Sequence, residues 1–286
     1  MSLDIHQHLW PPAFVAALKA RSRPPRLRAN SLELGDGTYQ IDLGAHDLDT
    51  RLASLDRHEI DTAVVSLQPT LGIDALAPSE AEELHLIWEQ GAQELIGAAP
   101  KRLAALSCGR AAPGFAGAIV AASALRDVDA LGALLRDLNE ADAMLFVHPS
   151  AAMPTHGAPP WWPAIADYTA EMQAAYLTWL SYAQERWPAV AVVFAILAGG
   201  GPFQLERLAS RGVDVRSGLH QNVFFDTASY GRRAIELCIE TYGVHQLVYG
   251  SDVPVIDPSP TLRALEGFGP SVLQLVTTDN PSRLFT

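Results

Sequence analysis

The hydrophobic positions of the chain fall into short apolar runs that alternate with longer amphipathic segments. Runs of strand length cover residues 3–9, 60–67, 103–108, 118–122, 143–147, 190–197, 223–228 and 246–250. Segments with apolar residues at helical spacing cover residues 47–58, 79–95, 128–140, 166–186, 203–210 and 232–242. Continuous apolar runs separated by helical segments are typical of buried strands in a parallel sheet.

Eight such strands predict an α/β fold in which the sheet closes into a (β/α)8 TIM barrel. An open doubly wound sheet is the alternative, but eight units in 286 residues favour the closed barrel. We expect a single domain over residues 1–286. The segment between Cys108 and Ala118 is too short for an ordinary crossover helix. Either the barrel is thin there or the assignment of two strands is wrong.

The region between the first two strands has a different pattern. Trp10-Pro11-Pro12 is expected to stop the first strand, and the basic, proline-broken stretch up to Arg28 is expected to be a loop. Residues 32–34 and 39–41 then flank Gly35-Asp36-Gly37, and Asp-Gly between two such runs is a strong hairpin signal. We therefore expect a small β-hairpin inserted after the first strand.

The composition narrows the class of partner. With 20 Lys and Arg against 32 Asp and Glu, the net charge of -12 argues against binding to nucleic acid or to an anionic membrane surface. Only two cysteines are present, which argues against a disulfide framework and favours a reducing, cytoplasmic setting. The apolar runs are too short to span a bilayer. We expect a small-molecule substrate, and the sequence leaves a homodimer open.

Polar residues that end apolar strands are the candidates for chemistry. His6 and His8 are separated by one residue, so in a strand both imidazoles point the same way, about 7 Å apart along the strand. His148 ends another apolar run, and Asp252 follows the last one. Three imidazoles and one carboxylate suit a divalent ion, with zinc as the leading guess and one position left for water. The alternative is that the His-x-His pair is incidental.

These residues lie in motifs that resemble a known family. Asp4-Ile5-His6-Gln7-His8, 145–149 (LFVHP), 250–254 (GSDVP) and 280–285 (NPSRLF) are similar to motifs of the amidohydrolase-related branch of the amidohydrolase superfamily. Within that branch the chain looks most like the aminocarboxymuconate-semialdehyde decarboxylase group. The resemblance implies a (β/α)8 barrel in which His6, His8, His148 and Asp252 bind one metal ion.

Two positions depart from the family pattern. In the decarboxylases a histidine on the sixth strand activates the metal-bound water, and Ile196 stands at the matching place. The arginine that binds the substrate carboxylate in the family falls near Gln40 and Ile41, and neither is basic. The interpretation we rank first is therefore a metal-dependent hydrolase of a small polar or carboxylated ester, lactone or amide, with a metal-activated water and Asp252 as proton carrier. A non-oxidative decarboxylase is second, and a metal-binding barrel without catalysis is third.

Several other residues have open roles. His156, Trp161 and Trp162 lie in the long loop after His148 and are candidates for substrate binding, with simple packing of the loop as the alternative. Asp226 ends the seventh strand and is expected to hydrogen-bond the barrel rim. Four histidines in polar segments or turns are expected to be solvated or capping side chains: His46, His58, His85 and His245.

Overall fold

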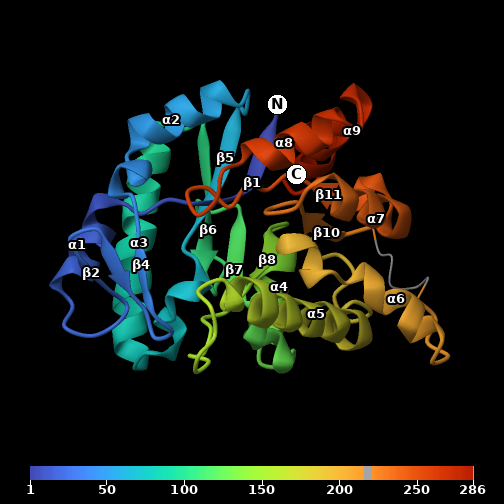
Figure 1. Cartoon of the computed structure of the whole chain (residues 1–286), viewed down its shortest axis with the longest axis horizontal. Helices are drawn as coiled ribbons and strands as arrows, with labels where there is room; N and C mark the ends of the chain where they lie inside the picture. The colour runs from blue at the N-terminus through green and yellow to red at the C-terminus, as the bar shows by residue number, and fades with distance from the viewer. Residues whose placement is uncertain (216–220, 286) are drawn as a thin grey trace.

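Parallel strands form the centre of the molecule, as the computed structural model shows for residues 1–215 and 221–285 (Figure 1). Eight of them form a nearly closed barrel in the order β1-β5-β6-β7-β8-β9-β10-β11. Their bounds are β1 (Leu3–His8), β5 (Thr62–Ser66), β6 (Leu103–Cys108), β7 (Gly117–Ala121), β8 (Met144–His148), β9 (Val192–Phe194), β10 (Val223–Asp226) and β11 (Leu247–Val248). The predicted barrel is confirmed.

The barrel closes where β1 meets the chain around β11. Ile5 N donates to Tyr249 O at 3.0 Å, and His8 N donates to Val253 O at 2.7 Å. These bonds continue past the end of β11 and hold the segment after it beside the last residues of β1. Asp252 is thereby brought next to the two strand-end histidines.

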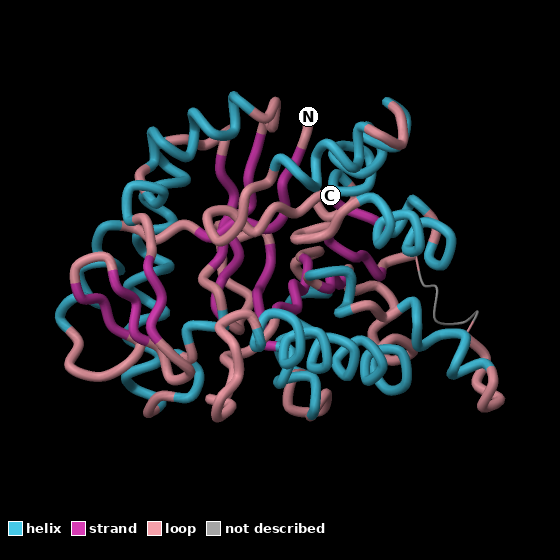
Figure 2. Tube along the Cα trace, in the orientation of Figure 1, coloured by secondary structure: helices cyan, strands magenta, loops and turns pink. Residues whose placement is uncertain are grey.

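Helices surround the strands on the outside of the barrel (Figure 2). They are α1 (Pro12–Ala20), α2 (Leu48–Arg57), α3 (Pro78–Ala98), α4 (Gly132–Glu140), α5 (Tyr168–Thr178), α6 (Pro202–Ala209), α7 (Arg232–Tyr242), α8 (Ser259–Glu266), α9 (Pro270–Gln274) and α10 (Asn280–Ser282). The connection between β6 and β7 has no helix, as its length predicts. No helix among the described residues is long and apolar enough to cross a membrane.

The expectation of a loop after the first strand is wrong for α1. Pro12 is the first residue of this helix, a position where its missing N–H costs nothing because that N–H would have no partner within the helix. Phe14 and Leu18 recur at helical spacing and are buried. The two prolines therefore end the strand and begin a helix.

The inserted hairpin is confirmed, and it has a third strand. β3 (Ser31–Glu33) and β4 (Thr38–Gln40) pair antiparallel around the Gly-Asp-Gly turn. β2 (Arg26–Arg28), which was expected to be loop, pairs with β3 on its other edge. Only Leu27 of β2 is buried, so its charged neighbours concealed a strand of three residues. This small sheet stands apart from the barrel strands in Figure 2.

Candidate metal centre

The predicted metal ligands lie at the ends of three barrel strands. His6 and His8 stand at the end of β1, and His148 ends β8. Asp252 follows β11. Parallel strands place their carboxyl ends at one rim of the barrel, so the four side chains meet there. One ligand atom from each lies within 4.8 Å of the others, which brings the whole predicted set together.

The ligand atoms surround a small, shielded space. Nε2 of His6 lies 3.3 Å from Nε2 of His8, and Nε2 of His8 lies 3.2 Å from Oδ1 of Asp252. Nε2 of His6 is 3.6 Å from the same carboxylate oxygen. The three imidazole rings meet edge to face with centroids 5.0 to 5.1 Å apart. All three histidines are buried, while Asp252 is partly exposed.

Each histidine uses its other ring nitrogen elsewhere. Nδ1 of His6 is 2.7 Å from Oδ2 of Asp226, Nδ1 of His8 is 3.2 Å from Ser66 O, and Nδ1 of His148 is 3.0 Å from Pro149 O. Carbonyl and carboxylate oxygens only accept, so Nδ1 must donate in all three rings. A neutral imidazole has one hydrogen, so each ring in its neutral form presents the Nε2 lone pair to the centre. His6, whose pKa is raised to about 9, must lose a proton to do so, and a bound cation would displace that proton.

A divalent cation fits this arrangement. The ligand atoms of His6, His8 and Asp252 lie 3.2 to 3.6 Å apart, and that of His148 lies within 4.8 Å of them. Lone pairs at these distances repel unless a positive charge lies between them. Zinc accepts this set of nitrogen and oxygen ligands, and manganese tolerates it.

The charges of the site shift the pKa values of its groups in different directions. Burial alone would lower the pKa of His6, but the carboxylate of Asp226 in particular raises it to about 9. Burial lowers the pKa of His8 and, more strongly, that of His148. Burial raises the pKa of Asp252, but the imidazoles around it, that of His8 first, hold it below the usual value. The carboxylate is therefore ionised at neutral pH, as a metal ligand must be.

Asp226 has a role that the sequence did not reveal. It was expected only to hydrogen-bond the barrel rim. Its Oδ2 binds His6, and its Oδ1 accepts the backbone N–H groups of Ile196 at 3.2 Å and Ala228 at 2.8 Å. The carboxylate is fully buried and fixes both the tautomer and the orientation of the His6 ring. Its place at the end of a predicted strand was the available signal.

Gly250 allows the last strand to approach this pair. A Cβ atom at this position would lie 2.8 Å from Cβ of His6 and 3.0 Å from Cβ of Asp226. Real Cβ atoms essentially never approach other atoms closer than 3.0 Å, so a side chain at position 250 would force the strands apart. Two residues later Asp252 adopts a left-handed conformation with φ 61°, which aspartate tolerates better than most residues.

A pocket of about 450 Å³ opens above the candidate metal centre. His8, His148 and Asp252 line its floor, and residues of the small sheet form one wall. Ile196 lines it at the end of β9, so no imidazole stands at that place. No Lys or Arg of the described part of the chain lines it. The lining also includes Trp10, Tyr39, Gln40, Asp42, His46, Gln68, Pro160, Pro163 and Tyr168.

Solved structures share this architecture. IDCase from Metarhizium anisopliae, in its apo form, matches with a TM-score of 0.81 and 21% identity over 100% of this chain and 97% of that chain. The 5-carboxyvanillate decarboxylase LigW from Sphingomonas paucimobilis matches with a TM-score of 0.77 and 18% identity over 99% and 98% of the two chains. This chain has their fold. The expectation drawn from the amidohydrolase-related motifs is thereby confirmed at the level of fold.

A third match has a metal. The dihydroxybenzoic acid decarboxylase from Polaromonas sp. JS666, with bound manganese and the inhibitor 2-nitroresorcinol, matches with a TM-score of 0.71 and 15% identity over 99% and 96% of the two chains. No protein-family model and no curated protein matches the chain. The likeness is therefore in the fold rather than in overall sequence.

The loop residues predicted to bind substrate lie outside the pocket above the metal centre. Trp161 is 56% exposed, and Trp162 is half-buried beside a separate cavity of about 90 Å³. His156 is exposed. None of the three lines the pocket above the metal centre, although Pro160 and Pro163 next to the tryptophans do. Their role in substrate binding stays a prediction.

The four histidines expected to be solvated or capping have different environments. His245 is exposed, and Nδ1 of His58 is bound to Ser54 O at the end of α2, which is a capping role as expected. His85 pairs with Asp74 at 3.3 Å. For His46 the expectation is wrong: the side chain is 7% exposed and lines the pocket.

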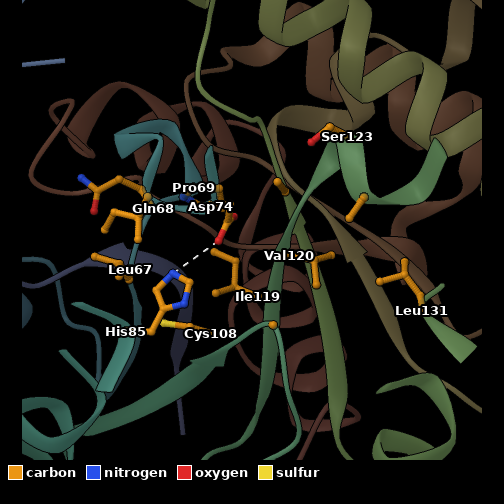
Figure 3. Close-up of a pocket in the computed structure, with 14 residues that line it drawn as sticks. Leu67, Gln68, Pro69, Asp74, His85, Cys108, Ile119, Val120, Ser123 and Leu131 are labelled. Atoms are coloured by element: carbon orange, nitrogen blue, oxygen red, sulfur yellow. Dashed lines mark ion pairs between the residues drawn. The ribbon is translucent and has the colours of Figure 1, made fainter. Parts of the chain in front are cut away.

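A second cavity of about 340 Å³ lies beside the first at the ends of β6 and β7 (Figure 3). His85, Asp74 and Cys108 line it together with mostly apolar residues. Burial raises the pKa of the Cys108 thiol well above its usual value, so the thiol stays protonated and is a poor nucleophile. Gln68 belongs to the lining of both cavities. We assign no chemistry to this second cavity.

Proposed function

We propose that the protein is a metal-dependent carboxy-lyase of the amidohydrolase-related type that removes CO2 from a small organic acid. The observation that carries the proposal is the convergence of three Nε2 lone pairs and the Asp252 carboxylate at the floor of a pocket. Two of the similar structures described above are named as decarboxylases. Together they favour decarboxylation over the hydrolysis that the sequence ranked first.

The residues of the metal centre would have separate roles in holding the ion and in orienting its ligands. His6, His8, His148 and Asp252 would hold the ion, which when bound supplies positive charge to hold and polarise an acidic substrate. Asp226 keeps the His6 lone pair directed at the ion. The buried rings exclude water from the floor of the pocket, which strengthens these electrostatic interactions.

Decarboxylation requires one proton transfer within this pocket. The bond between the carboxyl carbon and the rest of the substrate breaks, CO2 leaves, and the electron pair that stays behind takes up a proton. Ile196 has no group that can move a proton. Asp252 is partly exposed to the pocket and ionised at neutral pH, so it can take a proton from the substrate or solvent and return it to that carbon.

Hydrolysis of an ester, lactone or amide is the second candidate. Ile196 favours it, because a hydrolase that relies on the ion and Asp252 needs no imidazole at the end of β9. A metal-binding barrel without catalysis is the third candidate.

A parallel assay separates these candidates. Protein loaded with zinc or manganese would be tested for CO2 release from aromatic and unsaturated carboxylic acids, and for hydrolysis of esters, lactones and amides. We expect metal-dependent CO2 release, its loss in His148→Ala, and no loss in His245→Ala, which changes an exposed histidine far from the ligands. Hydrolysis without CO2 release would overturn the proposal, and bound metal without any turnover would favour the third candidate.

The identity of the ion is part of the same proposal. We infer one divalent ion per chain, with zinc favoured by the three imidazoles and manganese by the carboxylate. Elemental analysis of protein purified without chelator measures both. Less than about a tenth of an equivalent of any divalent metal after reconstitution would contradict the metal centre, since ligands in this geometry bind tightly.

A further inference from the structure

One part of the pocket lining is built around Trp10. This residue leaves β1 two positions after His8 and is 2% exposed. Its ring stacks on that of His46, with centroids 4.4 Å apart and planes 7° apart. Its indole Nε1 donates to Oε1 of Gln68 at 2.9 Å, and its backbone N–H donates to Nδ1 of His46 at 3.1 Å. Both N–H groups of Trp10 can only donate, so Nδ1 of His46 and Oε1 of Gln68 must be the acceptors.

These two bonds fix where His46 and Gln68 present hydrogen. Because Nδ1 of His46 accepts, the single ring hydrogen of the neutral imidazole is on Nε2. Burial, and then the charge of Arg51, lowers the pKa of His46 to about 3, so the ring is neutral at physiological pH. Because Oε1 of Gln68 accepts from the indole, its amide NH2 group points the other way. The structure thus provides two donors with known orientation.

Both donors belong to largely buried residues that line the pocket, and they have no acceptor among the described residues. His46 and Gln68 are each 7% exposed and line the pocket. Among residues 1–215 and 221–285, neither Nε2 of His46 nor Nε2 of Gln68 has a hydrogen-bond partner. The Gln68 side chain extends away from Val120 and Leu131 of the neighbouring cavity (Figure 3). Neither atom is among the fully buried polar atoms that lack a partner, so both donors are open to the pocket, where a ligand oxygen can accept from them in place of water.

The charge of the lining restricts the kind of oxygen. Among residues 1–215 and 221–285, no Lys or Arg lines the pocket, while Asp42 and Asp252 both do. One substrate carboxylate can be neutralised by the ion at the floor. A second carboxylate at the Trp10 wall would meet only neutral donors and would lose its hydration without a compensating cation. An uncharged acceptor loses far less.

We propose that His46 and Gln68, both held by Trp10, form a second anchoring point that binds an uncharged acceptor oxygen, such as a ketone or amide carbonyl, of the substrate. The inference rests on the proposed function in that the substrate's one carboxylate goes to the ion. It narrows the substrate class to small monocarboxylates with a distal carbonyl. The stacked Trp10 and His46 rings, with Tyr39 and Tyr168, form flat surfaces that suit a planar ring between the two groups.

The test compares ligands that differ only at the distal position. Calorimetry would measure binding of 3- and 4-acetylbenzoate, of the dicarboxylates isophthalate and terephthalate, and of 3- and 4-isopropylbenzoate to metal-loaded protein. The acetyl compound is expected to bind at least about fivefold more tightly than its apolar and dicarboxylate counterparts, the value of one net hydrogen bond. Equal affinities, or no binding of any of the six, would overturn the inference.

Two variants and one control locate the effect. Gln68→Glu replaces the amide donor by an acceptor that the indole can still bind, and His46→Phe keeps the stacked ring without its donor. Each should reduce the preference for the acetyl compound to within about twofold of its apolar counterpart. Gln40→Glu adds the same charge to the same pocket on β4 and should shift all ligands alike, with the preference unchanged. A preference that survives both His46→Phe and Gln68→Glu would overturn the inference.

Two readouts separate this inference from the metal centre. The same titrations on chelator-treated protein show whether affinity depends on the ion: binding that ignores the metal contradicts the proposed function, while the preference between ligands still tests the anchoring point. Nitrogen-15 NMR of metal-free protein should find the His46 hydrogen on Nε2. A hydrogen on Nδ1 would contradict the anchoring geometry whatever the ion does.

Discussion

The floor of the pocket and its Trp10 wall are built in opposite ways. The floor is made by residues at fixed places on barrel strands, where the alternation of side chains in β1 puts His6 and His8 on one side. The wall is made by Trp10, His46 and Gln68, which lie outside the strands and hold one another through stacking and hydrogen bonds. The floor has four converging ligands that suit a cation, whereas the wall has only neutral donors. Chemistry and selectivity can therefore be altered separately.

The largest expected effect comes from breaking the floor at Asp252. Asp252→Asn removes the carboxylate ligand and the group that we expect to carry the proton. Turnover should fall by roughly 10³-fold, within the range for lost acid–base catalysis. Steady-state kinetics with elemental analysis on the same preparation would measure both roles. Activity within tenfold of the wild type would show that another group moves the proton.

Asp226→Asn tests the support of the floor without touching a ligand. The amide can donate to Nδ1 of His6, which would move the ring hydrogen to Nε2 and direct it at the ion. Metal affinity should fall by about 10- to 100-fold, as for other groups that orient a ligating histidine. Competition with a chelator gives the affinity, and the melting temperature of the metal-free variant controls for folding. An unchanged metal affinity would show that Asp226 only hydrogen-bonds the barrel rim and does not orient His6.

The floor could be predicted from the sequence because its geometry is local. One residue between two histidines in a strand is enough to place both on one side, and the apolar runs show where strands end. The order of the motifs then brought His148 and Asp252 to the same rim. The position of Asp226 at the rim was predicted, but its support of His6 was not, since its three hydrogen bonds come from His6, Ile196 and Ala228.

The wall could not be predicted because its contacts are long-range. His46 lies in a polar segment, and its burial depends on Trp10, which is 36 positions away in the chain. Gln68 is 58 positions from the indole that orients it. Neither separation leaves a periodic pattern. The error at α1 has a different cause: the proline-broken stretch was expected to be a loop, although Pro12 begins a helix whose buried residues have local helical spacing.

Trp10→Phe distinguishes the wall from the floor most directly. The ring can still stack on His46, but the amide of Gln68 loses the donor that orients it. We expect KM or ligand Kd to rise about fivefold, the value of one or two hydrogen bonds, while metal content and kcat stay within about twofold. A kcat that falls in parallel with metal content would mean that the wall and the floor are not independent.

The smallest effect is expected at Ile196, which lines the pocket just after the end of β9. Ile196 has φ 47°, an unfavourable conformation for a β-branched side chain and one in which histidine is more often found. Its backbone N–H stays bound to Asp226 whatever the side chain is, so Ile196→His should fold and keep its metal. If Asp252 already moves the proton, the new imidazole adds little, and CO2 release should change by less than about threefold.

A missing base would instead be restored by the substitution, with a gain of about 10²- to 10⁴-fold in decarboxylation. Assaying Ile196→His beside Ile196→Asn, which also suits the left-handed backbone but supplies no base at neutral pH, separates the chemistry of the imidazole from relief of backbone strain. A large gain in the histidine variant alone would show that the wild-type centre lacks an effective base for decarboxylation, and would return hydrolysis to first place.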